Sequence, residues 1–389
     1  MIDRIEVFVT ELPVRVQRIM SSGSYDTGAP KQQLGKPVLV KIHADGVTGC
    51  GQIRPISPGH FVADTTHSAV AAIVEIYGPG LLGKRLFDIE SITGAFDARL
   101  AGNPAARAAL DIALHDAMGK ALKAPVHDLI GGCCQPDIPL EWSVSLASEV
   151  SVMVAEAKRA VDEFGMRVLC IKAADRRGWR QDVRHFEAVR RAVGDEIVIG
   201  IDPNTGWTLA DAISAVHALR GLGLGYIEQP VARRDLKGLA EVRREAAGIP
   251  VMADESLFTL QDAYALAEAR AVDAFCIKLY KVGGLSPARK IAAVAEASNI
   301  QLNCGGLAVQ SQLEAAAAAH FYAATPAGRM MGAGEFVFGL NTIGPDPLVP
   351  ETDFVARNGR VRVPRGPGLG ITVDEAALKK HTLRHEIIK

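Results

Sequence analysis

Three segments near the start of the chain have the β-branched content and the alternation of apolar and polar residues that predict strands. They are residues 4–10, 36–43 and 48–53. Asp45-Gly46 lies between the second and third segments, a position where an Asp-Gly pair is typical of a hairpin turn. The chain is therefore predicted to open with an antiparallel sheet.

Helical spacing of apolar residues follows this sheet. It is present at about residues 63–78 and is clearest in residues 104–122, where it forms an apolar stripe along one face. Pro104 suits the first turn of the second helix. The backbone N–H groups of a first turn have no partner within the helix, so a proline, which has no N–H, loses no hydrogen bond there. We therefore expect residues 1–125 to form a small α+β domain.

The pattern changes at about residue 139, where short apolar runs alternate with Ala-, Arg- and Glu-rich helical stretches. This alternation is typical of parallel β/α units. The candidate strands are LEWSVSL, RVLCIKA, IVIGIDPN, GYIEQP, VMADES, AFCIKLYK, IQLNCG and RMMGAGEF. Eight units predict an α/β fold with a closed, TIM-like (β/α) barrel over residues 126–340. The Gly- and Pro-rich residues 341–389 contain a strand-like GRVRVP and are expected to return to the first domain.

Five charged residues lie at the carboxyl ends of five consecutive predicted strands. They are Lys172, Asp202, Glu228, Asp254 and Lys278, separated by 30, 26, 26 and 24 residues. Because barrel enzymes build their sites at the carboxyl ends of the strands, all five are expected at one rim. A single carboxylate in such a place is more often a helix cap or a surface ion pair, but an ordered series at the spacing of one β/α unit favours a site.

The residue types in this series indicate a particular chemistry. Three carboxylates with no His or Cys among them suit Mg²⁺ better than Zn²⁺ or Cu²⁺, so Asp202, Glu228 and Asp254 are predicted to share one Mg²⁺. Such a cation would stabilise the enediolate that forms when a proton leaves the carbon next to a substrate carboxylate. Lys172 and Lys278 are the candidate bases, provided that burial and the cation lower their pKa from about 10.4. A purely structural ion-pair role for the lysines is the alternative.

Charge and composition exclude several other classes of function. The 43 basic and 44 acidic residues give a net charge of −1 and are spread along the chain, so we expect no nucleic-acid partner and no anionic membrane partner. No apolar run is long enough to cross a bilayer. The charged start MIDRIEVFVTELP is unlike a signal peptide, and six cysteines without a CxxC pair indicate reduced thiols, so a cytoplasmic location is expected.

The motifs around the five residues resemble those of the mandelate racemase and muconate lactonizing enzyme group of the enolase superfamily, over nearly the whole chain. They are IKA at Lys172, GIDPNTGW at Asp202, YIEQP at Glu228, ADES at Asp254, IKLYKVGGL at Lys278, and ALDIALHDAMGKALKAPVHDLIGG before the barrel. The resemblance implies an N-terminal α+β capping domain over the barrel, the three acids as metal ligands, and the two lysines as bases on opposite faces of the substrate. It also implies a homo-oligomer, either a dimer or an octamer.

One position departs from the pattern of the lysine-type branch, in which the second barrel strand usually ends in Lys-x-Lys. Here the strand has Cys170-Ile171-Lys172, so the like-charge repulsion that would lower the pKa of Lys172 is missing. The seventh strand, IQLNCGG, lacks the histidine of the branch that resembles mandelate racemase. The paired-lysine branch, similar to muconate lactonizing enzymes, therefore fits better.

Several residues near the five site residues are expected to have supporting roles or none in the chemistry. Glu255 and Lys281 are expected to support the site or to lie on the surface. Glu335 occupies the place of an eighth-strand acid in the resembled family. Cys304 is most simply a small buried hydrophobe, although it could face the substrate. Residues 20–33 are predicted to form a polar lid.

The sequence leaves the reaction open. A racemase, epimerase or cycloisomerase acting on a small carboxylate or an amino-acid derivative is the leading hypothesis, because two lysines can remove a proton from one face and return it on the other. A dehydratase acting on a hydroxy acid or a hydroxyproline-like compound is the alternative. A non-catalytic, metal-dependent binding protein is the third hypothesis, and it predicts no exchange of the substrate α proton with deuterated water.

Overall fold

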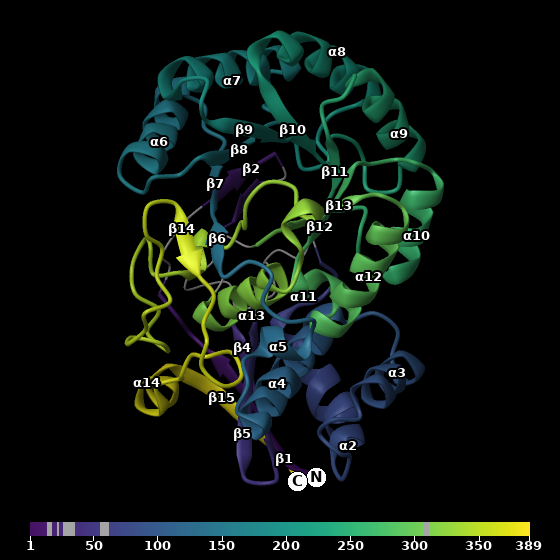
Figure 1. Cartoon of the computed structure of the whole chain (residues 1–389), viewed down its shortest axis with the longest axis vertical. Coiled ribbons are helices and arrows are strands. Elements are labelled where there is room, and N and C mark those ends of the chain that lie inside the picture. The colour runs from purple at the N-terminus through teal and green to yellow at the C-terminus, as the bar shows by residue number, and fades with distance from the viewer. Residues whose placement is uncertain (14–17, 22, 26–35, 55–61, 307–310) are drawn as a thin grey trace.

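The computed structural model describes residues 1–13, 18–21, 23–25, 36–54, 62–306 and 311–389. Figure 1 shows two adjoining parts: an antiparallel sheet with its helices, where both chain ends lie, and a curled parallel sheet surrounded by helices. Within these described ranges, none of the helices has both the length and the apolar character that crossing a bilayer requires.

The N-terminal part contains a four-stranded antiparallel sheet in the order β15-β1-β4-β5. Its strands are β1 (Ile2–Thr10), β4 (Val38–Ala44), β5 (Val47–Ile53) and β15 (Thr382–Ile388). Asp45 and Gly46 connect β4 to β5 with φ of 49° and 82°, so the predicted hairpin is confirmed. A short hairpin of β2 (Arg18–Met20) and β3 (Gly23–Tyr25) lies outside this sheet.

The helices of this part follow the sheet in the chain. They are α1 (Thr66–Ala71), the π-helical turn η2 (Ala72–Tyr77), α2 (Gly78–Leu81), α3 (Ile89–Arg99), α4 (Pro104–Leu122) and α5 (Val126–Leu129). The helix expected at about 63–78 is thus confirmed, and it runs without a break through α1, η2 and α2 with the π-helical turn in its middle. Helix α4 has the predicted limits, with Pro104 in its first turn.

Helix α4 buries more than the predicted apolar stripe, because nearly all of its middle residues are buried. One side of α4 packs against β5 at Gly49 and Gly51, where an added Cβ would lie 2.0 and 2.1 Å from backbone oxygens of the helix. Other sides face barrel helices. The helix is therefore held between the capping sheet and the barrel, and a local apolar pattern cannot show contacts on both sides.

The barrel contains seven parallel strands in the order β13-β12-β11-β10-β9-β8-β7. They are β7 (Glu141–Val144), β8 (Val168–Lys172), β9 (Val198–Asp202), β10 (Leu224–Glu228), β11 (Val251–Ala253), β12 (Ala274–Ile277) and β13 (Gln301–Cys304). The helices are α6 (Val150–Asp162), α7 (Trp179–Val193), α8 (Leu209–Leu219), α9 (Leu236–Glu245), α10 (Leu260–Glu268), α11 (Leu279–Val282), α12 (Leu285–Ala297) and α13 (Gln312–Ala323). The predicted α/β barrel with an N-terminal capping domain is confirmed.

The expected eighth strand, RMMGAGEF, is not a regular strand in the structure. Its residues still close the barrel, since Met330 bridges to Leu302 of β13 and Gly334 bridges to Leu140 beside β7. Gly332 has a φ of 72°, outside the range of a strand, and this interrupts the ladder. The two edges of the curled sheet are joined by single bridges and not by a continuous strand.

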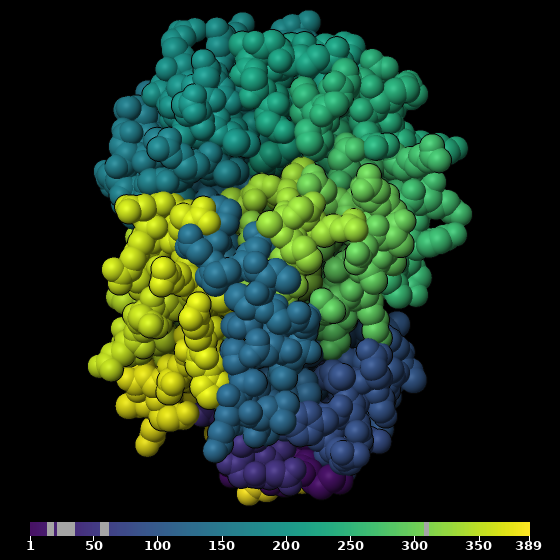
Figure 2. All heavy atoms as spheres, viewed as in Figure 1, coloured from purple at the N-terminus to yellow at the C-terminus, as the bar shows by residue number. Residues whose placement is uncertain are grey.

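The C-terminal residues contact both parts of the molecule. Strand β14 (Arg360–Arg362) pairs with β6 (Asp137–Pro139), and after α14 (Glu375–His381) strand β15 pairs with β1. Figure 2 shows this yellow segment packed beside the blue segment that leads into the barrel. The limits of 1–125, 126–340 and 341–389 for the domains stay a prediction.

The interior of the barrel is filled by a small cluster of side chains below the strand ends. It consists of Cys170, Tyr226, Met252, Ala274, Cys276 and Met331. Gly200 makes room for the aromatic ring, because a Cβ at that position would lie 2.1 Å from the ring of Tyr226. The cluster closes the barrel from below, so a site can open only at the carboxyl ends of the strands.

Candidate active site at the mouth of the barrel

The structure brings the five predicted site residues together at the barrel mouth, where all five are almost completely buried. Lys172 ends β8 and Lys278 follows β12, while the acids end or follow β9, β10 and β11. The order of the strands thus places the three acid-bearing strands between the two lysine-bearing strands. The sequence spacing predicted this arrangement because each β/α unit advances the chain by one strand.

Lys172 is paired with Asp202. Its ammonium group donates a hydrogen bond to Asp202 Oδ2. Asn204, two residues beyond this aspartate, donates from its backbone nitrogen to Oδ1 and from its side-chain amide to Oδ2, both at 2.8 Å. Asn204 has a φ of 47°, a left-handed conformation that asparagine tolerates better than most residues. One ammonium group and one amide therefore hold the Asp202 carboxylate.

Asp254 is held by two ammonium groups. Lys278 donates to its Oδ2 and Lys281 donates to its Oδ1, each at 2.6 Å. Lys281 also donates to the backbone oxygens of Asp254 and Cys276, at 2.6 and 3.0 Å. Burial raises the pKa of Asp254, but the two lysines outweigh it and lower the pKa to about 2. Lys281 is fully buried, so of its two predicted locations the one in support of the site is correct.

The pKa of the two candidate bases follows the neighbouring charges. Burial lowers the pKa of Lys172 and of Lys278, as the sequence argument expected. Asp202 beside Lys172 and Asp254 beside Lys278 outweigh burial, so the pKa of each lysine is well above its usual value. Both lysines are thus charged partners of the acids, and a cation bound by the same carboxylates would compete with them.

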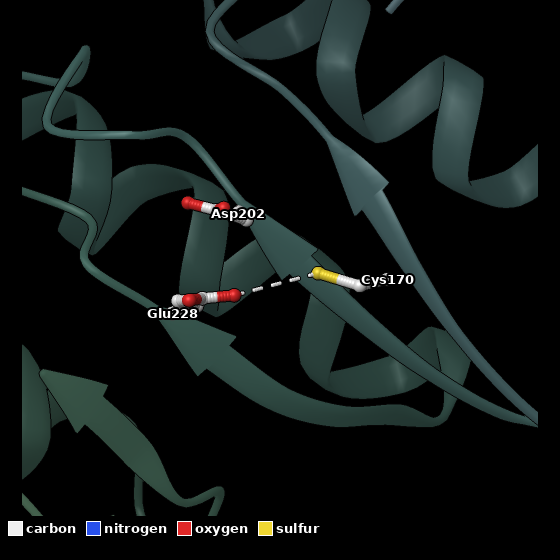
Figure 3. Close-up of side chains that lie close together, drawn as sticks. All are labelled: Cys170, Asp202 and Glu228. Atoms are coloured by element: carbon white, nitrogen blue, oxygen red, sulfur yellow. Dashed lines mark hydrogen bonds between the residues drawn. The ribbon is translucent and has the colours of Figure 1, made fainter. Parts of the chain in front are cut away.

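Among the three predicted metal ligands, Glu228 has a carboxylate oxygen without a hydrogen-bond partner. Its Oε1 has no hydrogen-bond partner and lies 3.9 Å from Lys278 Nζ, while its Oε2 accepts from Cys170 Sγ at 3.7 Å (Figure 3). Burial, and then the charge of Asp202, raise the pKa of Glu228 well above its usual value. A buried carboxylate oxygen without a partner, beside two further carboxylates, fits a hard divalent cation such as Mg²⁺.

Glu335 faces both lysines from the segment that closes the barrel. Its Oε1 lies 3.9 Å from Lys172 Nζ and its Oε2 lies 4.0 Å from Lys278 Nζ. Its Oε2 also accepts from the backbone nitrogen of Gly306 at 3.3 Å. The two ammonium groups therefore approach a common space from different directions, with one carboxylate facing that space.

Two families of protein domains match this chain. The mandelate racemase / muconate lactonizing enzyme N-terminal domain matches residues 5–131, and the enolase C-terminal domain-like family matches residues 152–377. The chain belongs to the mandelate racemase/muconate lactonizing enzyme family of the enolase superfamily. It is therefore an enzyme of that superfamily, and the resemblance inferred from the motifs is confirmed.

Relatives in this family are named for several different activities. A chloromuconate cycloisomerase of Pseudomonas putida is 32% identical over 352 residues, which cover 88% of this chain and 90% of the relative. A hydrophobic dipeptide epimerase of Enterococcus faecalis is 33% identical and covers 81% and 87%. The crystal structure of the N-succinyl Arg/Lys racemase from Bacillus cereus superimposes with a TM-score of 0.89 at 29% identity, over 100% of both chains. All three relatives are named as isomerases.

Sequence reasoning missed one buried acid below the site. Glu141 lies on β7, 1% exposed, and its Oε2 has no hydrogen-bond partner. Burial, and then the charge of Glu335, raise the pKa of Glu141 to about 8. A charged residue inside the predicted strand LEWSVSL was the available signal. Together with the site acids, Glu141 gives the barrel interior more carboxyl groups than ammonium groups.

Two further predictions have different outcomes. Cys304 donates to the backbone oxygen of Ala318 on α13 at 3.5 Å, so its thiol points out of the barrel and does not face a substrate.

Residues 22 and 26–33 of the predicted lid lie outside the described residues. The described Ser21 donates to Pro203 O at 2.9 Å, which places this end of the segment beside the carboxyl end of β9.

Proposed function

We propose that this enzyme removes and returns the proton on the carbon next to a carboxylate, as a racemase, epimerase or cycloisomerase. The observation that carries the proposal is the arrangement of Lys172 and Lys278 on strands that flank the three acid-bearing strands, with both ammonium groups near Glu335. The named activities of the relatives support an isomerase, since cycloisomerase, epimerase and racemase all require proton transfer at such a carbon.

Asp202, Glu228 and Asp254 are proposed to hold Mg²⁺. The donor set consists of oxygens, Glu228 Oε1 lacks a partner, and the named acids at the mouth outnumber the lysines. When bound, Mg²⁺ would hold the substrate carboxylate and supply positive charge where the enediolate develops negative charge. Occupancy of the site would also weaken the Lys172–Asp202 and Lys278–Asp254 pairs, which would lower the pKa of both lysines.

The residues of the chain then divide the proton transfer between them. A neutral Lys172 or Lys278 accepts the α proton from one face of the planar intermediate, and the other lysine in its charged form returns a proton to the opposite face. Lys281 keeps Asp254 oriented when Lys278 gives up its proton, because Lys281 holds the other oxygen of that carboxylate. The near-complete burial of all these groups excludes bulk water from the transfer.

The test is exchange of the α proton. Purified protein with Mg²⁺ would be incubated in deuterated water with N-acylated amino acids, dipeptides and unsaturated dicarboxylates, and proton NMR would follow the α position. We expect loss of the α-proton signal and inversion of configuration for at least one compound. A protein that binds these compounds without exchange would be the non-catalytic binding protein of the third hypothesis.

Dehydration is the second candidate, and Glu335 is the observation that favours it. Its carboxyl group lies within 4.0 Å of both lysines and could protonate a β-hydroxyl as it leaves. Hydroxy acids and hydroxyproline-like compounds in the same panel would then give unsaturated products. The homo-oligomer, as a dimer or an octamer, and the cytoplasmic location stay predictions.

A further inference from the structure

Two buried thiols flank the carboxylates of the proposed cation site. Cys170, Asp202 and Glu228 each offer a ligand atom, and these three atoms lie within 4.8 Å of one another (Figure 3). Glu228, Asp254 and Cys276 form a second group of the same kind. The two groups share Glu228, whose Oε1 has no hydrogen-bond partner although the residue is 1% exposed. The site therefore offers sulfur as well as oxygen ligands.

We infer that the barrel mouth also binds a thiophilic divalent cation of the Zn²⁺ or Co²⁺ class, with Cys170 Sγ, Asp202 and Glu228 as its ligands. Thiolates select such cations, whereas Mg²⁺ and Ca²⁺ take oxygen ligands. The inference concerns the carboxylates of the proposed function but does not depend on catalysis. It names a ligand that the three-acid set leaves out.

The structure favours Cys170 over Cys276 as the sulfur ligand. Both oxygens of Asp254, which belongs to the Cys276 group, accept from ammonium groups of Lys278 and Lys281. Asp202, in the Cys170 group, accepts from a single ammonium group, that of Lys172. A cation in the Cys170 group would therefore meet less positive charge.

The thiol is already directed at a shared ligand. Cys170 Sγ donates to Glu228 Oε2 at 3.7 Å, so a cation held by Glu228 would replace the thiol proton between these two atoms. The proton leaves for solvent as the sulfur coordinates.

The test uses cobalt as a spectroscopic probe in the metal-free, full-length protein. The parent carries Cys133→Ser and Cys134→Ser, because these two exposed thiols would otherwise bind the probe. Cobalt(II) is titrated without Mg²⁺, bound cobalt is measured by equilibrium dialysis, and absorption is recorded in the near ultraviolet, where sulfur-to-cobalt charge transfer occurs. We expect a charge-transfer band that saturates at one cobalt per chain.

Two matched serine variants separate the thiols. Cys170→Ser should lose the band and bind cobalt about 10- to 100-fold more weakly or worse, while its affinity for Mg²⁺ stays the same. Cys276→Ser should keep the band and the cobalt affinity of the parent. Cobalt bound without a band, or a band that survives Cys170→Ser, would overturn the inference, and so would a band lost in Cys276→Ser.

A measurement without a Cys170 variant covers the case in which that variant does not fold. X-ray absorption of the zinc-loaded parent should show one sulfur at about 2.3 Å from zinc, and a shell of oxygens alone would overturn the inference. Failure of the proposed function is a separate outcome. A sulfur-ligated cation in a protein that exchanges no α proton with Mg²⁺ would reject the function and leave this site standing.

Discussion

The barrel mouth and the contact between cap, barrel and C-terminal segment are both buried and polar, but they are organised differently. The second region, here called the cap contact, consists of Asp116, His127, His320 and Leu369. His320 Nε2 donates to Leu369 O at 3.2 Å, and its Nδ1 accepts from the backbone nitrogen of His127 at 3.2 Å. Both ring nitrogens of His320 thus have protein partners. At the mouth, by contrast, Glu228 Oε1 has no hydrogen-bond partner.

The degree to which buried polar groups are hydrogen-bonded distinguishes a binding site from a purely structural contact. In the cap contact, Asp116 accepts from the backbone nitrogens of Cys50 and Leu369 at 2.7 and 2.8 Å and from Lys120 at 2.7 Å. These bonds tie three distant parts of the chain together and leave no oxygen for a ligand. At the mouth the buried carboxyl groups outnumber the ammonium groups. This excess costs stability but attracts a cation.

Replacing the two lysines one at a time should give the largest effects. Lys172→Ala and Lys278→Ala should each lower racemisation by about 10²- to 10⁴-fold, because each removes the acid–base group of one face. Each variant should keep exchange in at most one stereoisomer, and opposite ones, as NMR in deuterated water would show. Lys120→Ala, at the cap contact, is the control and should keep both. Exchange in the same stereoisomer for both site variants would contradict opposite faces.

Glu228→Gln should lower proton exchange by about 10²- to 10³-fold through loss of Mg²⁺ binding, which calorimetry measures. Without Mg²⁺ its free energy of unfolding should stay equal to that of the wild type or rise, because an amide avoids the burial of a charge. Glu141→Gln is a matched control, a buried acid outside the three-acid set, and should still bind Mg²⁺. Unchanged Mg²⁺ affinity in Glu228→Gln would reject this residue as a ligand.

Asp116→Ala tests the cap contact. Two buried backbone N–H groups and Lys120 would lose their acceptor, so we expect the free energy of unfolding to fall by about 3–5 kcal/mol in urea titrations. Affinity for Mg²⁺ below the unfolding transition should stay that of the wild type. A stable variant with weakened Mg²⁺ binding would show that the two regions are not separate.

The smallest effect near neutral pH concerns the protonation of His320. Burial lowers the pKa of His320 to about 3, so the folded protein does not take up a proton there that the unfolded chain binds below about 6.5. His320 therefore contributes stability above about pH 6.5, and this is lost as pH falls towards 3, by up to about 1.4 kcal/mol per unit. His320→Asn should make the unfolding free energy less dependent on pH over this range. Equal slopes would mean that His320 is protonated in the folded protein.

The features that local pattern determines were predicted well. Asp45-Gly46 gave a hairpin because its turn geometry depends on those two residues. The limits of α4 follow from Pro104 and helical spacing. The five site residues could be placed on one rim because a constant length between strand ends is itself a consequence of β/α repetition.

Features that depend on distant partners were not predicted. The burial of α4 on nearly every side requires both the capping sheet and the barrel helices. The resemblance gave Glu335 the place of an eighth-strand acid, but its approach to both lysines depends on how residues 330–335 join the two edges of the barrel, where Gly332 breaks the strand geometry. Lys281 looked ambiguous in the sequence because only the folded barrel brings it onto Asp254.

The sequence by itself thus determined the chemical groups, their order around the rim and the fold that carries them. The tertiary structure decided how their charges are shared: two lysines on Asp254, one on Asp202, and a thiol beside Glu228. The physical reason is that periodicity and spacing act along the chain. The pairing and pKa of buried charges depend on distances of a few ångströms between strands, which only the closed barrel fixes.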